Sequence, residues 1–308
     1  MNQTYIDTVR LLLAIAPAVF ASGRFAMKGV TALNLFVQQM PRLSVDIDLV
    51  LVDHRPDRHA ALQAIGQELT AVQATLAGQG YRAHLPANAD GDDVKLVVSN
   101  ETAQVKVEVN FVFRGTALPV ETRSLVATAQ ELFTTDLAVP VLATAEIYGS
   151  KLVAAMDRQH PRDIFDVIHM LDHFGWQASF VDCFVVYLAG HNRPVHEVLF
   201  PKTKPLEPAF TNEFAGMTRD PVELDTLAQV QGRLFQELPR LLTSAHRDFL
   251  LSLVQGAPAW ELMPMQHLPE LPALKWKLFN LAKLKKSNTK LFAAQHQMLV
   301  ERFDPHAC

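Results

Sequence analysis

The first 113 residues alternate between segments with the apolar spacing of a helix and short apolar runs typical of strands. Helical spacing predicts helices over residues 5–21, 32–40 and 57–77. Runs rich in β-branched and other apolar residues, bounded by turn residues, predict strands over residues 24–28, 45–52, 81–85, 94–100 and 104–113. This alternation predicts a mixed sheet flanked by helices.

From residue 122 onward only the helical period continues. It predicts helices over residues 143–157, 161–174, 176–190, 221–238, 244–253 and 274–284. The stretches 191–217 and 255–272 each hold four prolines, which favours irregular connections. We therefore expect an α+β fold, with a core of residues 1–120 followed by a mainly helical domain of residues 121–308.

Composition narrows the class of protein. With 49% hydrophobic residues in 308, the chain has ample material for buried cores. Its 28 basic and 32 acidic side chains give a net charge of -4, so any contact with nucleic acid must use a local patch. The two cysteines, Cys183 and Cys308, are too few for a disulfide framework. This scarcity of cysteines favours a cytoplasmic setting, and since no apolar run reaches the roughly 20 residues of a membrane span, we expect a soluble protein without membrane contact.

Two aspartates interrupt the strand predicted at residues 45–52. The strand period of two places Asp46 and Asp48 on one face, with their Cα atoms roughly 6–7 Å apart. Paired carboxylates of this kind can bind divalent cations, which remove their mutual repulsion. The alternative is that the strand edge faces water and both side chains are simply solvated.

A third carboxylate, Glu108, lies on the polar side of the strand predicted at residues 104–113. If the two strands are neighbours, Glu108 completes an acidic triad. The alternative is a half-exposed strand on which Lys106 and Asn110 accompany it. Upstream, Gly29 and Thr31 stand between a strand and a helix N-terminus, where free N–H groups favour phosphate, although Thr31 can equally serve as a helix cap.

The order Gly-x-Thr, helix, Asp-x-Asp and a later Glu resembles the nucleotidyltransferase core of the DNA polymerase β type. Residues 27–33, which read Met-Lys-Gly-Val-Thr-Ala-Leu, and residues 42–49, which read Arg-Leu-Ser-Val-Asp-Ile-Asp-Leu, resemble the first motif of the AbiEii/AbiGii toxin family. That family usually reads Lys-Gly-Gly-Thr-Ala-Leu and then Arg-x-Ser-x-Asp-hydrophobic-Asp. Val30 replaces the second glycine, which bears on how closely the backbone can approach a triphosphate.

A second stretch resembles the family pattern of a helix with Lys, a short turn and then Arg-Asp-x-x-Asp. Its members are Glu146, Lys151, Arg158, Arg162, Asp163 and Asp166. Lys151 and Arg158 are seven residues apart and share one helical face. Read without the resemblance, Arg162 and Asp163 are first-turn residues of a helix after Pro161, and Asp166 belongs to a surface pair.

The resemblance implies an Mg²⁺- or Mn²⁺-dependent nucleotidyltransferase that acts as the toxin of a type IV toxin–antitoxin, or abortive infection, system. It implies transfer of a nucleoside monophosphate from an NTP to an acceptor such as a tRNA 3′ end, and a cognate antitoxin as partner. Metal-binding and catalytic roles fall on Asp46, Asp48 and Glu108, further catalytic roles on Lys151 and Asp163, and nucleotide binding on Lys28, Gly29, Thr31, Ser44, Lys151 and Arg158. Two alternatives stay open, a protein side chain as acceptor and a catalytically silent module that binds nucleotide or a partner.

A basic segment near the C-terminus bears on the acceptor. Two aromatic residues, Trp276 and Phe279, stand among six lysines, namely Lys275, Lys277, Lys283, Lys285, Lys286 and Lys290. Phosphate contacts and base stacking could hold an RNA end there. The alternative is the solvated face of an amphipathic helix whose apolar residues point inward.

Overall fold

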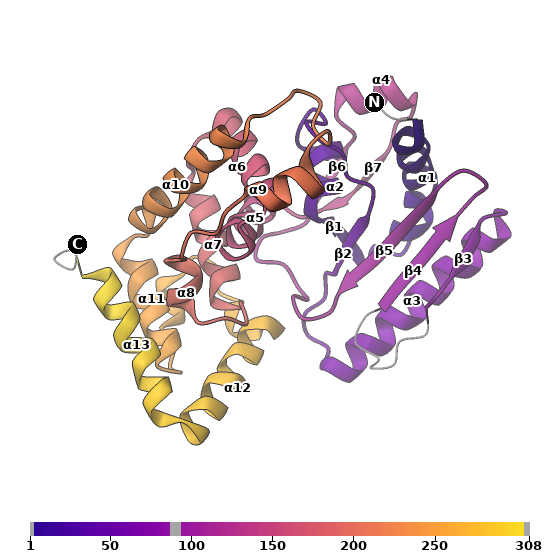
Figure 1. Ribbon diagram of the computed structural model, residues 1–308. Coiled ribbons are helices and arrows are strands. Elements are labelled where there is room, and N and C mark those ends of the chain that lie inside the picture. Colours follow the sequence, from indigo (N-terminus) through magenta and orange to yellow (C-terminus); the bar gives the residue numbers. More distant parts are fainter. Residues whose placement is uncertain (1–2, 87–93, 305–308) are drawn as a thin grey trace. The chain divides into compact units, whose positions relative to one another are not determined.

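The computed structural model describes residues 3–86 and 94–304, and these fold into two compact units (Figure 1). Unit 1 comprises Met1–Ile147 and Met217–Asp220, and unit 2 comprises Tyr148–Gly216 and Pro221–Cys308. The chain therefore passes from one unit to the other three times, at residues 147–148, 216–217 and 220–221.

Unit 1 is built on a seven-stranded mixed sheet with the strand order β3-β4-β5-β2-β1-β7-β6. Its strands are β1 (Phe25–Lys28), β2 (Ile47–Leu51), β3 (Arg82–His84), β4 (Val94–Ser99), β5 (Gln104–Asn110), β6 (Glu121–Ser124) and β7 (Ala138–Val141). The pairs β2·β5 and β1·β7 are parallel, and the other neighbours are antiparallel. The predicted mixed sheet flanked by helices is confirmed.

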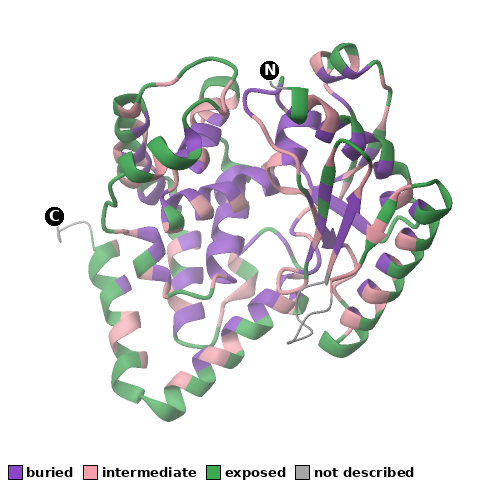
Figure 2. Ribbon diagram, turned by 45° about the vertical axis from the view of Figure 1, so that its right-hand side comes forward, coloured by how far each residue is buried: buried purple, intermediate pink, exposed green. Residues whose placement is uncertain are grey.

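The helices that begin in unit 1 are α1 (Gln3–Phe20), α2 (Gly29–Phe36), α3 (Arg58–Gly78), α4 (Ala127–Phe133) and α5 (Thr144–Arg158), of which α5 continues into unit 2. Helices α1 and α3 contact each other and both contact the sheet, so they cover one of its faces. Strand alternation explains why. In β5 the buried side chains of Val105, Val107 and Val109 alternate with more exposed ones (Figure 2), whereas β2 is buried at every position except Asp48.

Unit 2 is helical, as predicted. After α5 it contains α6 (Pro161–Phe174), α7 (Ala178–Ala189), α8 (Val195–Leu199), α9 (Glu207–Ala209), α10 (Leu224–Leu241), α11 (Ser244–Val254), α12 (Pro272–Ser287) and α13 (Thr289–Phe303). Its core includes Tyr148, Phe174 and Phe180, whose ring centroids lie 5.2–5.9 Å apart. Gly149 lets α5 approach α7, because a Cβ there would lie 2.5 Å from the Cβ of Cys183.

Two strands lie where the sequence predicted none. The expectation that strands end before residue 122 is wrong, because β6 and β7 extend the sheet beside β1. Strand β6 reads Glu-Thr-Arg-Ser and is mostly exposed, so it carries no apolar alternation, and β7 contains Pro140, which usually argues against a strand. Helix α13 was also missed, since only Leu299 on it is fully buried. Cys308 lies outside the described residues.

Candidate active site

Strand register brings four charged residues into one row across the sheet. Lys28 on β1 lies opposite Asp48 on β2, Asp48 lies beside Glu108 on β5, and Glu108 lies opposite Lys95 on β4. Residues in register on neighbouring strands point to the same face, so the four side chains project from one side of the sheet. The neighbouring strands proposed for Asp48 and Glu108 from the sequence are therefore present.

Asp46 precedes β2 by one residue and belongs to the same polar side. Partial desolvation of its carboxyl group raises the pKa of Asp46, the positive charges of Lys106 and Lys95 lower it, and the negative charge of Glu108 raises it further. The influence of Glu108 indicates that the two carboxylates lie near each other. The three predicted acidic side chains thus gather on the polar face of β2 and β5.

Glu108 is engaged by a lysine that sequence reasoning did not single out. Lys95 Nζ lies 2.6 Å from Glu108 Oε1. Within residues 3–86 and 94–304, no group of three His, Cys, Asp or Glu side chains is arranged to hold a metal ion. Three partly exposed carboxylates are the donor type that a hard divalent cation takes, and the contact with Lys95 involves Oε1 of Glu108. Metal binding by Asp46, Asp48 and Glu108 therefore stays a prediction.

The glycine of the first motif is required by the backbone and by its neighbour. Gly29 has a φ of +75°, and a Cβ there would lie 2.3 Å from Asp48 Oδ2. Gly29 also begins α2, directly after β1, so the N-terminus of this helix starts beside Asp48. Val30 does not have a positive φ, so its backbone conformation accepts a side chain without strain.

Thr31 holds the segment that carries Asp46. Its hydroxyl donates to the main-chain oxygen of Asp46 at 2.5 Å and lies 2.8 Å from the hydroxyl of Ser44. Because the Thr31 hydrogen is directed to Asp46, Ser44 is the donor in the second bond. Thr31 is 1% exposed, and α2 has no side-chain cap at its N-terminus. Its observed role is to join α2 to the approach to β2.

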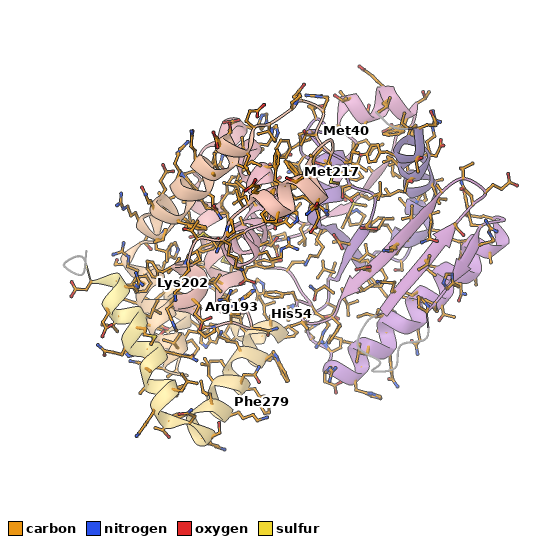
Figure 3. The ribbon with its side chains drawn as sticks, viewed as in Figure 1. Met40, His54, Arg193, Lys202, Met217 and Phe279 are labelled. Carbon is orange, nitrogen blue, oxygen red and sulfur yellow. The ribbon has the colours of Figure 1, made fainter. Side chains whose placement is uncertain are left out.

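The loop before Ser44 is fixed from two further directions. Asn34 on α2 donates from Nδ2 to the main-chain oxygen of Arg42 at 2.8 Å. The segment Met217–Asp220 returns to unit 1 and bonds to this loop, with Leu43 N donating to Met217 O at 3.0 Å. Figure 3 labels Met40, at the start of this loop, and Met217, whose main-chain oxygen accepts the bond from Leu43. No local pattern in the sequence indicated this return of the chain.

The second motif forms a buried ionic network within unit 2. Lys151 Nζ lies 3.0 Å from Asp163 Oδ1 and 3.0 Å from Asp166 Oδ2, and the three side chains are at most 7% exposed. Arg158, which is 62% exposed, donates from Nη2 to Asp163 Oδ1 at 2.8 Å. Asp166 is therefore a buried partner of Lys151 and not part of a surface pair. Lys151 has its ammonium group directed at two carboxylates.

Glu146 and Arg162, the other members of the motif, have structural contacts. Glu146 is 1% exposed and accepts hydrogen bonds from the main-chain nitrogens of Ala117 and Leu118 at 2.7 and 3.0 Å. It thereby fixes the chain after β5 to the start of α5. Arg162 donates from Nη2 to the main-chain oxygen of Glu213 at 3.0 Å within unit 2.

Comparisons with known proteins agree with this arrangement. The fold is similar to that of MenT4, a nucleotidyltransferase toxin from Mycobacterium tuberculosis H37Rv, with a TM-score of 0.60 and 18% sequence identity over 90% of this chain and 93% of that one. Curated protein sequences yield no match. Residues 10–280 match the sequence profile described as nucleotidyl transferase AbiEii toxin, type IV TA system. Because this match spans most of the 308 residues, the chain belongs to the AbiEii family of nucleotidyltransferase toxins.

Proposed function

We propose that this nucleotidyltransferase transfers a nucleoside monophosphate from an NTP to an RNA 3′ end, such as that of a tRNA, and that a cognate antitoxin restrains it. Family membership supports the reaction class and the toxin role. The observation that carries the proposal is the gathering of Asp46, Asp48 and Glu108 on one face of the sheet, with the Gly29 turn against Asp48.

In this proposal Asp46 and Asp48 would hold divalent cations, Mg²⁺ or Mn²⁺, and Glu108 would add a third carboxylate. Cations held there would neutralise the phosphates and favour the ionised form of the acceptor hydroxyl. Thr31 and Ser44 act through position, because their hydrogen bonds fix the main chain of Asp46. A carboxylate held in this way needs no rearrangement when the substrate arrives.

Gly29 and the first turn of α2 receive the phosphates of the NTP, with their N–H groups as donors. Lys28, which is opposite Asp48 in the sheet, adds a positive charge beside them. The acceptor oxygen attacks the α-phosphorus and loses its proton to solvent, while the bond to the bridging oxygen breaks and pyrophosphate leaves. Each turnover therefore produces one pyrophosphate and one longer RNA.

Lys151 and Arg158 have different surroundings, and we assign them different parts in nucleotide binding. Arg158 is mostly exposed, and its guanidinium group has more donors than its bond to Asp163 uses, which suits phosphate binding. Lys151 is buried between Asp163 and Asp166, so it contributes by holding this part of α5 and α6, and reaches a nucleotide only if that network opens. Asp163 pairs with the side chains of both Lys151 and Arg158 and so sets their positions.

The test uses the whole chain with Mg²⁺, each of the four α-labelled NTPs and total RNA. We expect label in RNA together with pyrophosphate release, and loss of both in Asp48→Ala. Asp53→Ala is the matched control, because Asp53 lies just beyond the same strand, is exposed and pairs only locally with Arg55. Undiminished transfer by Asp48→Ala would refute the assignment of the metal-binding carboxylates.

The same assay separates the alternatives for the acceptor. Label in protein and none in RNA would replace RNA by a protein side chain as acceptor. Nucleotide binding without pyrophosphate release, in the presence of Mg²⁺ or Mn²⁺ and all these acceptors, would refute transfer altogether. Co-expression with the product of the adjacent reading frame tests the antitoxin, which should relieve growth inhibition by the wild-type chain. Inhibition that persists with Asp48→Ala would dissociate toxicity from transfer.

A further inference from the structure

Helix α12 in unit 2 carries an exposed aromatic pair. The side chains of Trp276 and Phe279 are 48% and 60% exposed, and their rings stack with centroids 5.6 Å apart and planes inclined by 19°. Phe279 is labelled on α12 in Figure 3. Trp276 and Phe279 also have the highest exposed fractions among the large exposed hydrophobic residues in the described chain. Two exposed rings that stack on each other offer a flat surface for a further ring.

Lysines share the helical face of this pair. Lys275, Lys283 and Lys286 are exposed, and they lie four residues before Phe279, four after it and seven after it. With a rise of 1.5 Å per residue, the face from Trp276 to Lys286 is about 15 Å long. No acidic residue occurs between Glu270 and Glu301 in a chain whose net charge is -4. The face is therefore locally positive although the protein as a whole is acidic.

The opposite face of α12 is already occupied. Ala273, Leu274 and Leu281 are buried in unit 2. Lys277 is buried with them, and its Nζ donates to the main-chain oxygens of His191 and Arg193 at 2.8 and 2.7 Å. The basic segment thus contains both of the arrangements considered from the sequence, an inward apolar face and an outward face of lysines. An inward-facing role leaves the exposure of the two rings unexplained.

We infer that the α12 surface, defined as Lys275, Trp276, Phe279, Lys283 and Lys286, binds single-stranded RNA. Aromatic rings that stack unpaired bases, flanked by lysines that contact phosphates, are the chemistry of single-strand recognition. This inference rests on the proposed function, in which RNA is the acceptor. The α12 surface would then hold unpaired nucleotides of that acceptor by stacking and charge, largely without regard to base sequence.

Two other occupants fit the α12 surface less well. A membrane-binding helix keeps its apolar residues on a face separate from its charges, whereas here the free apolar groups lie among lysines and the remaining apolar face is buried. Protein interfaces are generally depleted in lysine, yet three of the five residues of this surface are lysines. Charge and stacking together favour a nucleic acid.

The test measures binding of a labelled single-stranded RNA of about ten nucleotides by fluorescence anisotropy, with the whole chain. We expect Trp276→Ala/Phe279→Ala to weaken binding about tenfold or more, because each ring contributes a base stack. Trp276→Phe should retain most of the affinity, since a phenyl ring still stacks. Leu241→Ala, which removes an exposed apolar side chain on α10, is the matched control and should bind as wild type.

Salt dependence tests the lysines separately. Log affinity falls with log salt, and each phosphate contact to a single strand contributes about 0.7 to the steepness of this fall. Changing Lys275, Lys283 and Lys286 to Gln should therefore make the fall shallower by about 2. The exposed Lys202→Gln is the matched control and should leave the slope unchanged. Quenching of tryptophan emission by RNA should disappear in Trp276→Phe, because Trp176 and Trp260 are less exposed.

Several results would overturn the inference. Equal affinity of the wild type and Trp276→Ala/Phe279→Ala for RNA would remove the stacking surface. Tighter binding of single-stranded DNA, of an RNA duplex or of anionic lipid vesicles than of single-stranded RNA would assign the α12 surface to another ligand. Asp48→Ala separates the proposed function from this inference, because this variant should lose NMP transfer but bind RNA as the wild type does. RNA binding in the absence of any transfer would refute the proposed function and leave this inference intact.

Discussion

Replacing Gly29 by alanine should damage the candidate active site more than the fold. Two costs follow from the structure. A non-glycine residue at a φ of +75° costs about 1–2 kcal/mol of stability. The new Cβ would lie 2.3 Å from Asp48 Oδ2, so the carboxylate must move by about 1 Å to reach a normal contact distance, which adds about 0.5–1.5 kcal/mol if its rotamer is strained. We expect a total loss of about 1.5–3.5 kcal/mol.

The displaced carboxylate should have a larger effect on the reaction. A misplacement of about 1 Å in a catalytic group can lower the rate about a hundredfold. We therefore expect Gly29→Ala to reduce the rate of labelled NMP transfer about a hundredfold while the chain remains folded. Urea unfolding measures the free energy of unfolding, and single-turnover transfer with saturating NTP measures the rate.

Gly23→Ala is the matched control for backbone strain. Gly23 has a φ of +69°, close to that of Gly29, but a Cβ there would have no neighbour within 4 Å. It should lose about 1–2 kcal/mol of stability and retain full activity. In an Asp48→Ala background, the stability cost of Gly29→Ala should fall toward that of Gly23→Ala, because the clash with Oδ2 is gone. Equal activity of Gly29→Ala and Gly23→Ala would refute the contact between Gly29 and Asp48 as the reason for glycine.

Three further substitutions test other features. Lys151→Met should destabilise the chain by about 3–5 kcal/mol, because it removes the buried lysine that Asp163 and Asp166 share and leaves Asp163 paired only with the exposed Arg158; a urea midpoint equal to wild type would contradict the buried network. Burial lowers the pKa of Lys277 to about 8, below its ordinary value of 10.5. Between these two pH values the unfolded chain binds the proton and the folded chain does not, so the free energy of unfolding should rise by up to roughly 3 kcal/mol as the pH goes from 8 to 10.5. This rise should be absent in Lys277→Met and present in Lys275→Met, which changes an exposed lysine. Identical dependence of the unfolding free energy on pH in the two variants would contradict the lowered pKa of Lys277. Thr31→Val removes the bond to the main chain of Asp46 and should lower transfer about tenfold or more at a stability cost of about 1 kcal/mol, whereas unchanged turnover would show that this bond does not position Asp46.

The sequence predicted those parts of unit 1 that carry a strong local pattern. The period of two around Asp48 indicated both the strand and the face of its carboxylates, and the polar positions in β5 placed Glu108 in the same way. Gly29 could be singled out because a glycine between a strand and a helix often has a positive φ. The pairing of β2 with β5 was only a hypothesis, since strand order depends on contacts between distant segments.

Features that depend on distant contacts could not be read locally. The ion pair of Lys95 with Glu108 exists only because β4 and β5 are antiparallel in one particular register. The short strand β6 has polar residues throughout and is recognisable only beside β7. Lys151 was predicted to bind a nucleotide with Asp163 holding its side chain, and Asp163 does contact it. Nothing in the spacing of the motif indicated that Asp166 would also reach the lysine in the interior.

The return of Met217–Asp220 to unit 1 limits how this protein can be divided. A chain that stops at Ile147 keeps every strand of the sheet but loses the main-chain partners of Leu43 and Pro41, two and four amino acids upstream of Val45. Cleavage within residues 201–216 would leave Met217–Asp220 covalently attached to the chain only on its C-terminal side. We therefore expect an insertion or deletion next to Met217–Asp220 in the helical part of the chain to alter the loop leading to Asp46.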